Sequence, residues 1–197
     1  MNAAAWINLD SLSSKKHHLL FEKPPAPMTT MSHSHTLSLH FTVLADTPLG
    51  PLRLAGDQSG LHRLEFTQSP SIAEFPAPPS GWVRCDEYFR EARHQLELYF
   101  RRQLQAFELP LAPAGTSFQL RVWQQLRQVP WGATATYGEI AAGIGQPSAC
   151  RAVGLANSRN PLPILIPCHR IIGSNRSLTG YNGGLDRKQR LLELEHR

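Results

Sequence analysis

Residues 135–159, ATYGEIAAGIGQPSACRAVGLANSR, predict two short helices joined by a turn that contains glycine. Gly143 and Gly145 close the first helix, because glycine readily adopts the left-handed backbone that ends a helix. Pro147 stands near the first turn of the second helix, where a missing backbone N–H costs little. Two such helices in a basic region favour a helix-turn-helix whose second helix would face DNA, although any small helical hairpin fits the same pattern.

The second predicted helix carries a run of small residues, at Ala149, Ala152, Gly154 and Ala156. Small side chains allow another backbone to approach a helix closely. Arg151 is the only long projection among them. An ordinary solvated arginine is the alternative, but it leaves the small neighbours unexplained.

A further helix is predicted before this pair, in the stretch FQLRVWQQLRQVP that starts at Phe118. Thr116 or Ser117 is its expected N-cap, because a hydroxyl can accept a hydrogen bond from a free N–H of the first turn. Pro130 is expected to end the helix. Its apolar face consists of Phe118, Val122, Trp123 and Leu126.

After the helix pair, residues 163–172 read PILIPCHRII, with Cys168 inside an apolar run and followed at once by His169 and Arg170. A lone cysteine among isoleucine and leucine is most often a small buried hydrophobic residue. A reactive cysteine needs a base or a positive charge beside it, because the thiolate is the nucleophile. His169 and Arg170 meet that requirement.

The last predicted helix, LDRKQRLLELE, follows Gly183 and Gly184. Glu195 lies four residues after Leu191 and three after Leu192, which places its carboxylate on the apolar stripe of the helix. A glutamate is rarely buried without a partner. The alternative is a surface glutamate at a fraying C-terminus.

The earlier part of the chain predicts a small α+β unit over residues 37–112 and a disordered extension over residues 1–36. Alternating apolar residues from Leu37 predict about three antiparallel strands. A proline-rich loop, residues 69–81, leads to a helix within DEYFREARHQLELYFRRQL that can lie across the sheet. Nothing in this unit points to catalysis. The fold class is therefore α+β, with a sheet-plus-helix domain followed by a mainly helical domain over residues 113–197 that contains the helix-turn-helix.

The charge distribution, the cysteines and the lengths of the apolar runs narrow the possible functions further. Residues 1–116 carry 10 Lys+Arg against 11 Asp+Glu, a net charge of −1, whereas residues 117–197 carry 10 against 4, a net charge of +6. A basic second half favours a polyanionic partner. The three cysteines, Cys85, Cys150 and Cys168, lack the spacing of a disulfide framework or a zinc cluster and are expected to be reduced. No apolar run approaches the roughly 18 to 20 residues of a membrane span, and the start lacks a secretory signal, so a cytoplasmic protein is expected.

Taken together, these motifs resemble one family. ILIPCHRII matches the PCHR signature, with its apolar flanks, of the O6-alkylguanine-DNA alkyltransferases, also called methylated-DNA–protein-cysteine methyltransferases. The resemblance runs from about Phe118 to Glu195 through TYGEIA, RAVGLANSRNPLPILIPCHR and LTGYNGG. The first unit is similar to the family's variable domain in layout only.

The resemblance implies a role for each matching residue. Cys168 would be the alkyl acceptor, His169 would draw off its proton through a water, and Glu195 would hold the imidazole. Asn160 would be the hinge between the helix-turn-helix and the reactive loop, against the alternative of a plain Asn-Pro turn. Tyr137 would contact the flipped guanine and the DNA backbone, against the alternative of a core tyrosine.

The same resemblance implies how DNA is bound. Arg151 would enter the base stack from the minor groove and fill the space of the extruded nucleotide, and the small residues Ala149, Ala152 and Gly154 would let the helix settle into the groove. The damaged base would then lie in a pocket formed by the residues around the acceptor, namely Pro163, Ile171, Tyr181, Asn182 and Gly183.

The expected function is direct-reversal DNA repair, in which one methyl or other alkyl group passes from O6-alkylguanine in double-stranded DNA to Cys168 in a single turnover. We expect a monomer without cofactor, metal or membrane contact. Two alternatives differ in class. A Cys-His-Glu hydrolase would need an oxyanion hole, for which no signature is found, and a binding-only relative would lack the reactive cysteine. Repair of O4-alkylthymine and the preferred size of the alkyl group stay open.

Overall fold

The computed structural model describes residues 39–67, 75 and 77–196, and all of them belong to one compact unit, His35–Arg197. The expected disordered extension, residues 1–36, lies outside the described residues, as does much of the proline-rich loop. We call residues 39–67, 75 and 77–113 the sheet region and residues 117–196 the helical region.

The sheet region contains three antiparallel strands, β1 (His40–Leu44), β2 (Leu52–Asp57) and β3 (Gly60–Phe66), as the alternating pattern predicted. A short strand that the sequence did not indicate, β4 (Val83–Arg84), pairs parallel to β1 and completes the order β3-β2-β1-β4. Gly60 has a φ of +134°, and a Cβ there would lie 2.5 Å from the carbonyl oxygen of Pro110. Glycine is therefore required where the segment after the sheet passes close to β3.

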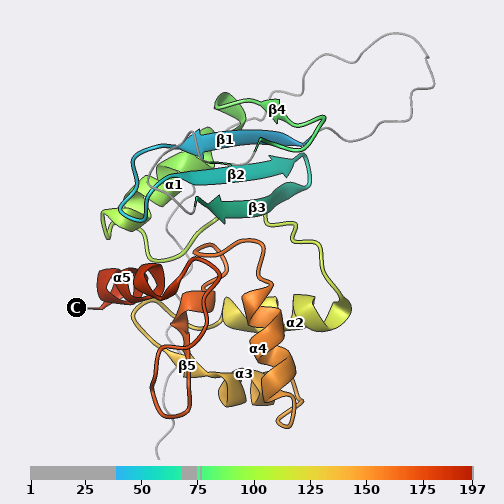
Figure 1. The fold of residues 1–197 in the computed structure, drawn as a ribbon, viewed down its shortest axis with the longest axis vertical. Helices are drawn as coiled ribbons and strands as arrows, with labels where there is room; N and C mark the ends of the chain where they lie inside the picture. The colour runs from blue at the N-terminus through green and yellow to red at the C-terminus, as the bar shows by residue number, and fades with distance from the viewer. Residues whose placement is uncertain (1–38, 68–74, 76, 197) are drawn as a thin grey trace, which may run out of the picture. The chain divides into compact units, whose positions relative to one another are not determined.

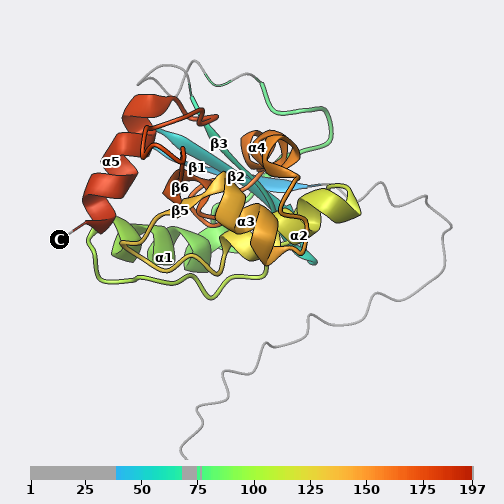
Figure 2. The same cartoon turned by 90° about the horizontal axis from the view of Figure 1, so that it is seen from below.

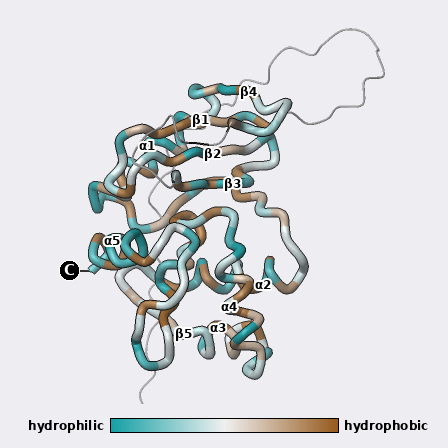
Figure 3. The backbone as a smooth tube through the Cα atoms, viewed as in Figure 1, coloured by the Kyte–Doolittle hydropathy of each residue, from teal (hydrophilic) through white to brown (hydrophobic). Residues whose placement is uncertain are grey.

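Helix α1 (Arg90–Phe100) follows the 3₁₀ turn η2 (Glu87–Phe89) and lies across the sheet (Figure 1). Its buried residues include Ala92, Leu96 and Tyr99, which recur at helical spacing and join the same core as the leucines of β2. In Figure 3 hydrophobic residues stand out along β1, whereas polar and apolar residues alternate along β3 and α5.

The helical region consists of α2 (Ser117–Leu126), α3 (Tyr137–Gly143), α4 (Cys150–Ser158) and α5 (Leu185–Glu195). Helices α2, α3 and α4 contact one another, and Figure 2 shows them gathered on one side of the unit. Thr116 is the N-cap of α2, one of the two residues predicted for that role, and it forms a capping box with Gln119. The predicted hairpin is thus formed by α3 and α4.

Two details of these helices differ from the prediction. Pro130 was expected to end α2, but the helix ends earlier, at Leu126, and turns formed by backbone hydrogen bonds bridge the gap to the proline. Pro147 was expected near the first turn of the next helix, but α4 begins only at Cys150. In both cases the helix contains fewer residues than the sequence pattern predicts. The adjoining residues form turns with their own backbone hydrogen bonds instead of a further helical turn.

A two-stranded parallel pair connects the hairpin to the reactive stretch. Strand β5 (Ala135–Thr136) pairs with β6 (Ile171–Ile172), and β6 follows directly after the 3₁₀ turn η3 (Cys168–Arg170). Since α3 begins at the residue after β5, this pairing places Tyr137 beside the chain that carries Cys168. Within the described part of the chain, no helix has the length and apolar character needed to cross a membrane.

The capping box of α2 gives a test of local stability. Replacing Thr116 with Ala removes the hydroxyl that accepts from the backbone N–H of Gln119, so the free energy of unfolding should fall by about 1 kcal/mol. Urea denaturation measures the change. Thr116→Ser keeps the hydroxyl and should stay close to the wild type, and equal losses in both variants would contradict the assignment.

Candidate active site

The apolar run before Cys168 forms a tight buried turn. The backbone N–H of Ile166 donates to the carbonyl of Leu162 at 2.8 Å, and Ile164 has a left-handed φ of +74°. That conformation is unfavourable for a β-branched side chain, so surrounding contacts must hold it. Asn160 supplies two of them: its Nδ2 donates to the carbonyl of Ile166 at 2.8 Å, and its Oδ1 accepts from the N–H of Leu162 at 3.0 Å.

Cys168 opens η3 directly after this turn and is only 2% exposed. Burial raises the pKa of its thiol to about 11, against opposing effects of a hydrogen bond with the Asn160 side chain and of the positive charge of Lys188. At neutral pH the side chain is therefore a thiol, not a thiolate. A reaction at Cys168 requires a base that removes its proton.

His169 and Glu195 form a buried pair beside the cysteine. Nε2 of His169 lies 2.9 Å from Oε1 of Glu195, and both side chains are almost fully shielded from solvent. Arg170 donates to both carboxylate oxygens, from Nε to Oε2 at 2.8 Å and from Nη2 to Oε1 at 2.9 Å. Its third nitrogen, Nη1, donates to the carbonyl of Val129 at 2.6 Å. The inward-facing glutamate predicted from the sequence is confirmed.

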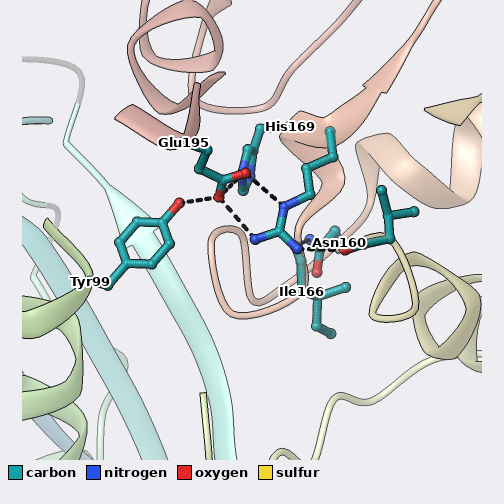
Figure 4. A network of polar contacts seen from close by, with 7 residues as sticks. Tyr99, Asn160, Ile166, His169 and Glu195 are labelled. Carbon is teal, nitrogen blue, oxygen red and sulfur yellow. Dashed lines mark hydrogen bonds and ion pairs between the residues drawn. The ribbon is translucent and has the colours of Figure 1, made fainter. Parts of the chain in front are cut away.

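Tyr99 reaches the same carboxylate from the sheet region. Its hydroxyl donates to Oε1 of Glu195 at 2.6 Å, and Figure 4 shows the tyrosine approaching the carboxylate from the side opposite Asn160 and Ile166. Tyr99 lies in the stretch DEYFREARHQLELYFRRQL, which the sequence predicts to contain a helix, in a unit where nothing pointed to catalysis. The helical spacing could not reveal this contact, because the two residues stand 96 positions apart.

The electrostatics of the pair favour a neutral base next to an ionised acid. Burial lowers the pKa of His169, against the opposing effect of its hydrogen bond to Glu195. For Glu195, burial would raise the pKa, but hydrogen bonds from His169, Arg170 and Tyr99 outweigh it and bring the pKa to about 2. The neutral imidazole then donates its Nε2 proton to the carboxylate, so the lone pair of His169 is on Nδ1.

Lys188 is a second buried group that the sequence did not single out for the site. Its Nζ donates to the carbonyls of Ile171 at 2.5 Å and Thr179 at 2.8 Å, and burial lowers its pKa to about 8. The lysine thus ties α5 to β6 and to the loop before Tyr181. Its one distinguishing mark in the sequence is that it is the single lysine among the ten Lys and Arg residues of positions 117–197.

The residues expected around the damaged base differ in burial: some are buried in the core and others line a cleft. Ile171 and Gly183 are buried, and so is Tyr181, whose ring centre lies 6.0 Å from that of Phe66 on β3. Pro163 and Asn182 line a cleft of about 570 Å³ together with Asn160 and residues of β3, whereas Cys168 does not line it. Tyr137 is half-buried, and its hydroxyl lies 3.0 Å from Oγ1 of Thr179.

The small residues of α4 separate onto two faces. Arg151 and Ala152 are exposed, and Ala149, the N-cap, is half-buried. Gly154 is half-buried beside the ring of Tyr137. Ala156, the last of the small residues, is buried instead, and its carbonyl accepts from Nε1 of Trp123 at 2.9 Å. Helical periodicity alone did not distinguish the packed face from the open one.

All three cysteines are free thiols, as expected: Cys168 is buried, Cys85 is half-buried and Cys150 is exposed. In the described ranges, no group of three or more His, Cys, Asp and Glu side chains could hold a metal ion.

Comparison with known proteins identifies the family. Residues 117–197 match the profile of the 6-O-methylguanine DNA methyltransferase DNA binding domain, and residues 40–113 match that of the ribonuclease-like domain of the same enzymes. The chain belongs to the 6-O-methylguanine DNA methyltransferase family.

Individual members of the methyltransferase family are similar over most of their length. The methylated-DNA–protein-cysteine methyltransferase of Methanosarcina acetivorans is 51% identical over 155 residues, which cover 79% of this chain and 97% of that protein. The enzyme of that name from Mycobacterium leprae is 50% identical over 153 residues, or 76% of this chain and 88% of that protein. The crystal structure of Mycobacterium tuberculosis OGT in complex with DNA matches with a TM-score of 0.72 and 46% identity, covering 79% of this chain and 92% of that chain.

The ionised Glu195 should make stability depend on acidity. Its pKa in the folded protein, about 2, is below the ordinary value of 4.5, so its contribution is complete above about pH 4.5 and is lost as the pH falls toward 2. Glu195→Gln should cost on the order of 3 kcal/mol of unfolding free energy at pH 7, and the gap from the wild type should narrow in that acidic window.

Urea denaturation at several pH values measures the gap. Glu193→Gln, on the same helix but exposed, is the matched control and should show a small gap at every pH. A gap for Glu195→Gln that does not change with pH would contradict the role of the ionised carboxylate.

Proposed function

We propose that Cys168 is the acceptor in the reaction of this family. The protein repairs DNA by direct reversal, because it transfers an alkyl group from O6-alkylguanine in DNA to one of its own cysteines. The observation that supports Cys168 is the buried His169–Glu195 pair beside it. Cys168 and His169 are consecutive residues of η3.

The first step of the proposed mechanism is removal of the thiol proton. With its pKa raised to about 11, Cys168 is protonated at neutral pH. The lone pair of His169 Nδ1 is available, since this atom is buried and has no hydrogen-bond partner within the described residues. His169 therefore accepts the proton, directly or through a water, and Glu195 stabilises the imidazolium that forms.

The second step is substitution at the alkyl carbon. The sulfur of Cys168 forms a bond to this carbon, the bond between the carbon and O6 breaks, and the electron pair passes to the guanine. The proton held by His169 returns to the guanine ring, so unmodified guanine and a thioether are the products. Neither His169 nor Glu195 can hydrolyse a carbon–sulfur bond, so each molecule acts once.

The exposed face of α4 supports the proposed DNA-binding residues. O6-Alkylguanine is stacked and paired in a DNA duplex. The nucleotide must therefore be extruded from the duplex before the sulfur can reach the alkyl group, and extrusion costs a few kcal/mol. Arg151 is exposed on α4 and can occupy the space left in the stack. Ala149, Ala152 and Gly154 would let α4 approach the minor groove.

The remaining roles concern the extruded base. Tyr137 would contact the guanine and the DNA backbone, and Asn160 would hold the reactive turn by its two hydrogen bonds. The base would lie among five residues near the acceptor, which are Pro163, Ile171, Tyr181, Asn182 and Gly183. We propose a monomer, because one chain supplies Tyr99, His169, Arg170 and Glu195. We also propose two domains, residues 37–112 and 113–197, a boundary one residue before the end of the sheet region.

A stoichiometric titration tests the acceptor. Protein mixed with excess methylated duplex should repair one lesion per molecule and then stop, and peptide mass analysis should find one added methylene on Cys168. Cys168→Ala should repair none, whereas Cys150→Ala, which removes the exposed thiol on α4, should behave as the wild type. Repeated turnover, or methyl on Cys85 or Cys150, would overturn the proposal.

The proposed role of Arg151 predicts a substrate-dependent loss. Arg151→Ala should slow transfer from duplex DNA by roughly 10- to 100-fold, because extrusion of the nucleotide costs a few kcal/mol, and it should leave transfer from a free alkylguanine base nearly unchanged. Arg121→Ala, which removes the same charge from an exposed site on α2, is the control and should affect duplex repair less. Equal losses on both substrates would contradict the assignment.

A further inference from the structure

One oxygen of Glu195 accepts hydrogen bonds from three side chains. Oε1 is 2.6 Å from the hydroxyl of Tyr99, 2.9 Å from Nε2 of His169 and 2.9 Å from Nη2 of Arg170. The other oxygen, Oε2, accepts from Nε of Arg170 at 2.8 Å. Arg170 alone fixes the plane of the carboxylate through its two bonds, so the hydroxyl of Tyr99 is not needed to orient it.

We infer that Tyr99 is a positioning residue of the active site, which tunes the basicity of His169 through the shared oxygen of Glu195. This inference rests on the proposed role of His169 as the base for Cys168. It gives the sheet region a part in the reaction, since Tyr99 lies on α1 and the other members of the network lie in the helical region.

The direction of the effect follows from charge. A hydrogen bond donated by the neutral Tyr99 hydroxyl stabilises negative charge on Oε1, so less of that charge acts on the imidazole of His169. Without the hydroxyl, Glu195 attracts the proton of the imidazolium more strongly. The pKa of His169 should therefore rise, and His169 should lose its function as a base at a higher pH.

Among the described residues, the other charged groups near the pair do not change with Tyr99. Arg170 lies beside His169 on η3, and Lys188 acts on His169 from α5; both lower the pKa of the imidazole. Glu193 and His196 flank Glu195 but are exposed. Tyr99 itself stays protonated, because burial, together with the neighbouring Glu195, raises its pKa well above the ordinary value.

Tyr99→Phe isolates the hydroxyl, because the ring keeps its contacts. The ring centre of Tyr99 lies 5.5 Å from that of Phe100, 5.1 Å from that of Phe107 and 5.0 Å from that of Trp131. A matched control is Tyr88→Phe, which removes a hydroxyl from a half-exposed tyrosine on η2 in the same region.

The test has two measurements on full-length protein. The first is the rate of alkyl transfer from a free alkylguanine base between pH 5 and 8. The acidic limb of this profile should move to higher pH by roughly half to one unit in Tyr99→Phe, with the rate above the limb retained, and should not move in Tyr88→Phe. A profile that is lowered equally at all pH values, or that does not move, would reduce Tyr99 to a packing residue.

The second measurement is an NMR titration of the His169 ring in unreacted protein with labelled histidine. The pKa of His169 should be higher in Tyr99→Phe than in the wild type, and equal values would overturn the inference. This titration does not require alkyl transfer. If Cys168 is not the acceptor, the wild-type titration with methylated duplex will show it. If Tyr99 does not act on His169, the NMR titration will show that independently.

Discussion

The carboxylate of Glu195 stays ionised away from water because four hydrogen bonds reach it, from Tyr99, His169 and Arg170. An unpaired buried charge would cost several kcal/mol, so α5, η3 and α1 must be docked together before this group is tolerated. The bond to Nε2 also holds the His169 ring in place. The docking of α5, η3 and α1 therefore completes the fold and forms the hydrogen-bond network of Glu195 at the same time.

The position of Cys168 depends on this assembly through the turn that precedes it. Ile164 is in the left-handed region, which is unfavourable for a β-branched residue, and Asn160 compensates with hydrogen bonds to Leu162 and Ile166. On the side of the sheet region, the N–H of Leu64 donates to the carbonyl of Pro161 at 2.9 Å. The backbone before Cys168 is therefore fixed by both regions, which suits the acceptor role that we propose for its thiol.

Helix α4 has a packed face and an exposed face. Val153, Ala156 and Asn157 are buried, and Trp123 of α2 donates to the carbonyl of Ala156, whereas Arg151 and Ala152 face solvent. The net charge of +6 over residues 117–197 is carried mainly by arginine, which binds phosphates well. A helix with one packed face and one open face can contact DNA without loosening the core beneath it.

The sequence by itself determined the features that depend on neighbours in the chain. The capped start of α2, the α3–α4 hairpin and the three antiparallel strands follow from spacing and from local hydrogen bonds. Spacing placed Glu195 on the apolar stripe of its helix but left a surface position open. The motif around Cys168 was sufficient to predict the family. Tertiary structure decided the partners of Glu195 and Lys188 and the burial of Ala156. Tyr99 and Glu195 meet across 96 residues, and no local pattern encodes a contact that exists only after two separately formed elements have packed together.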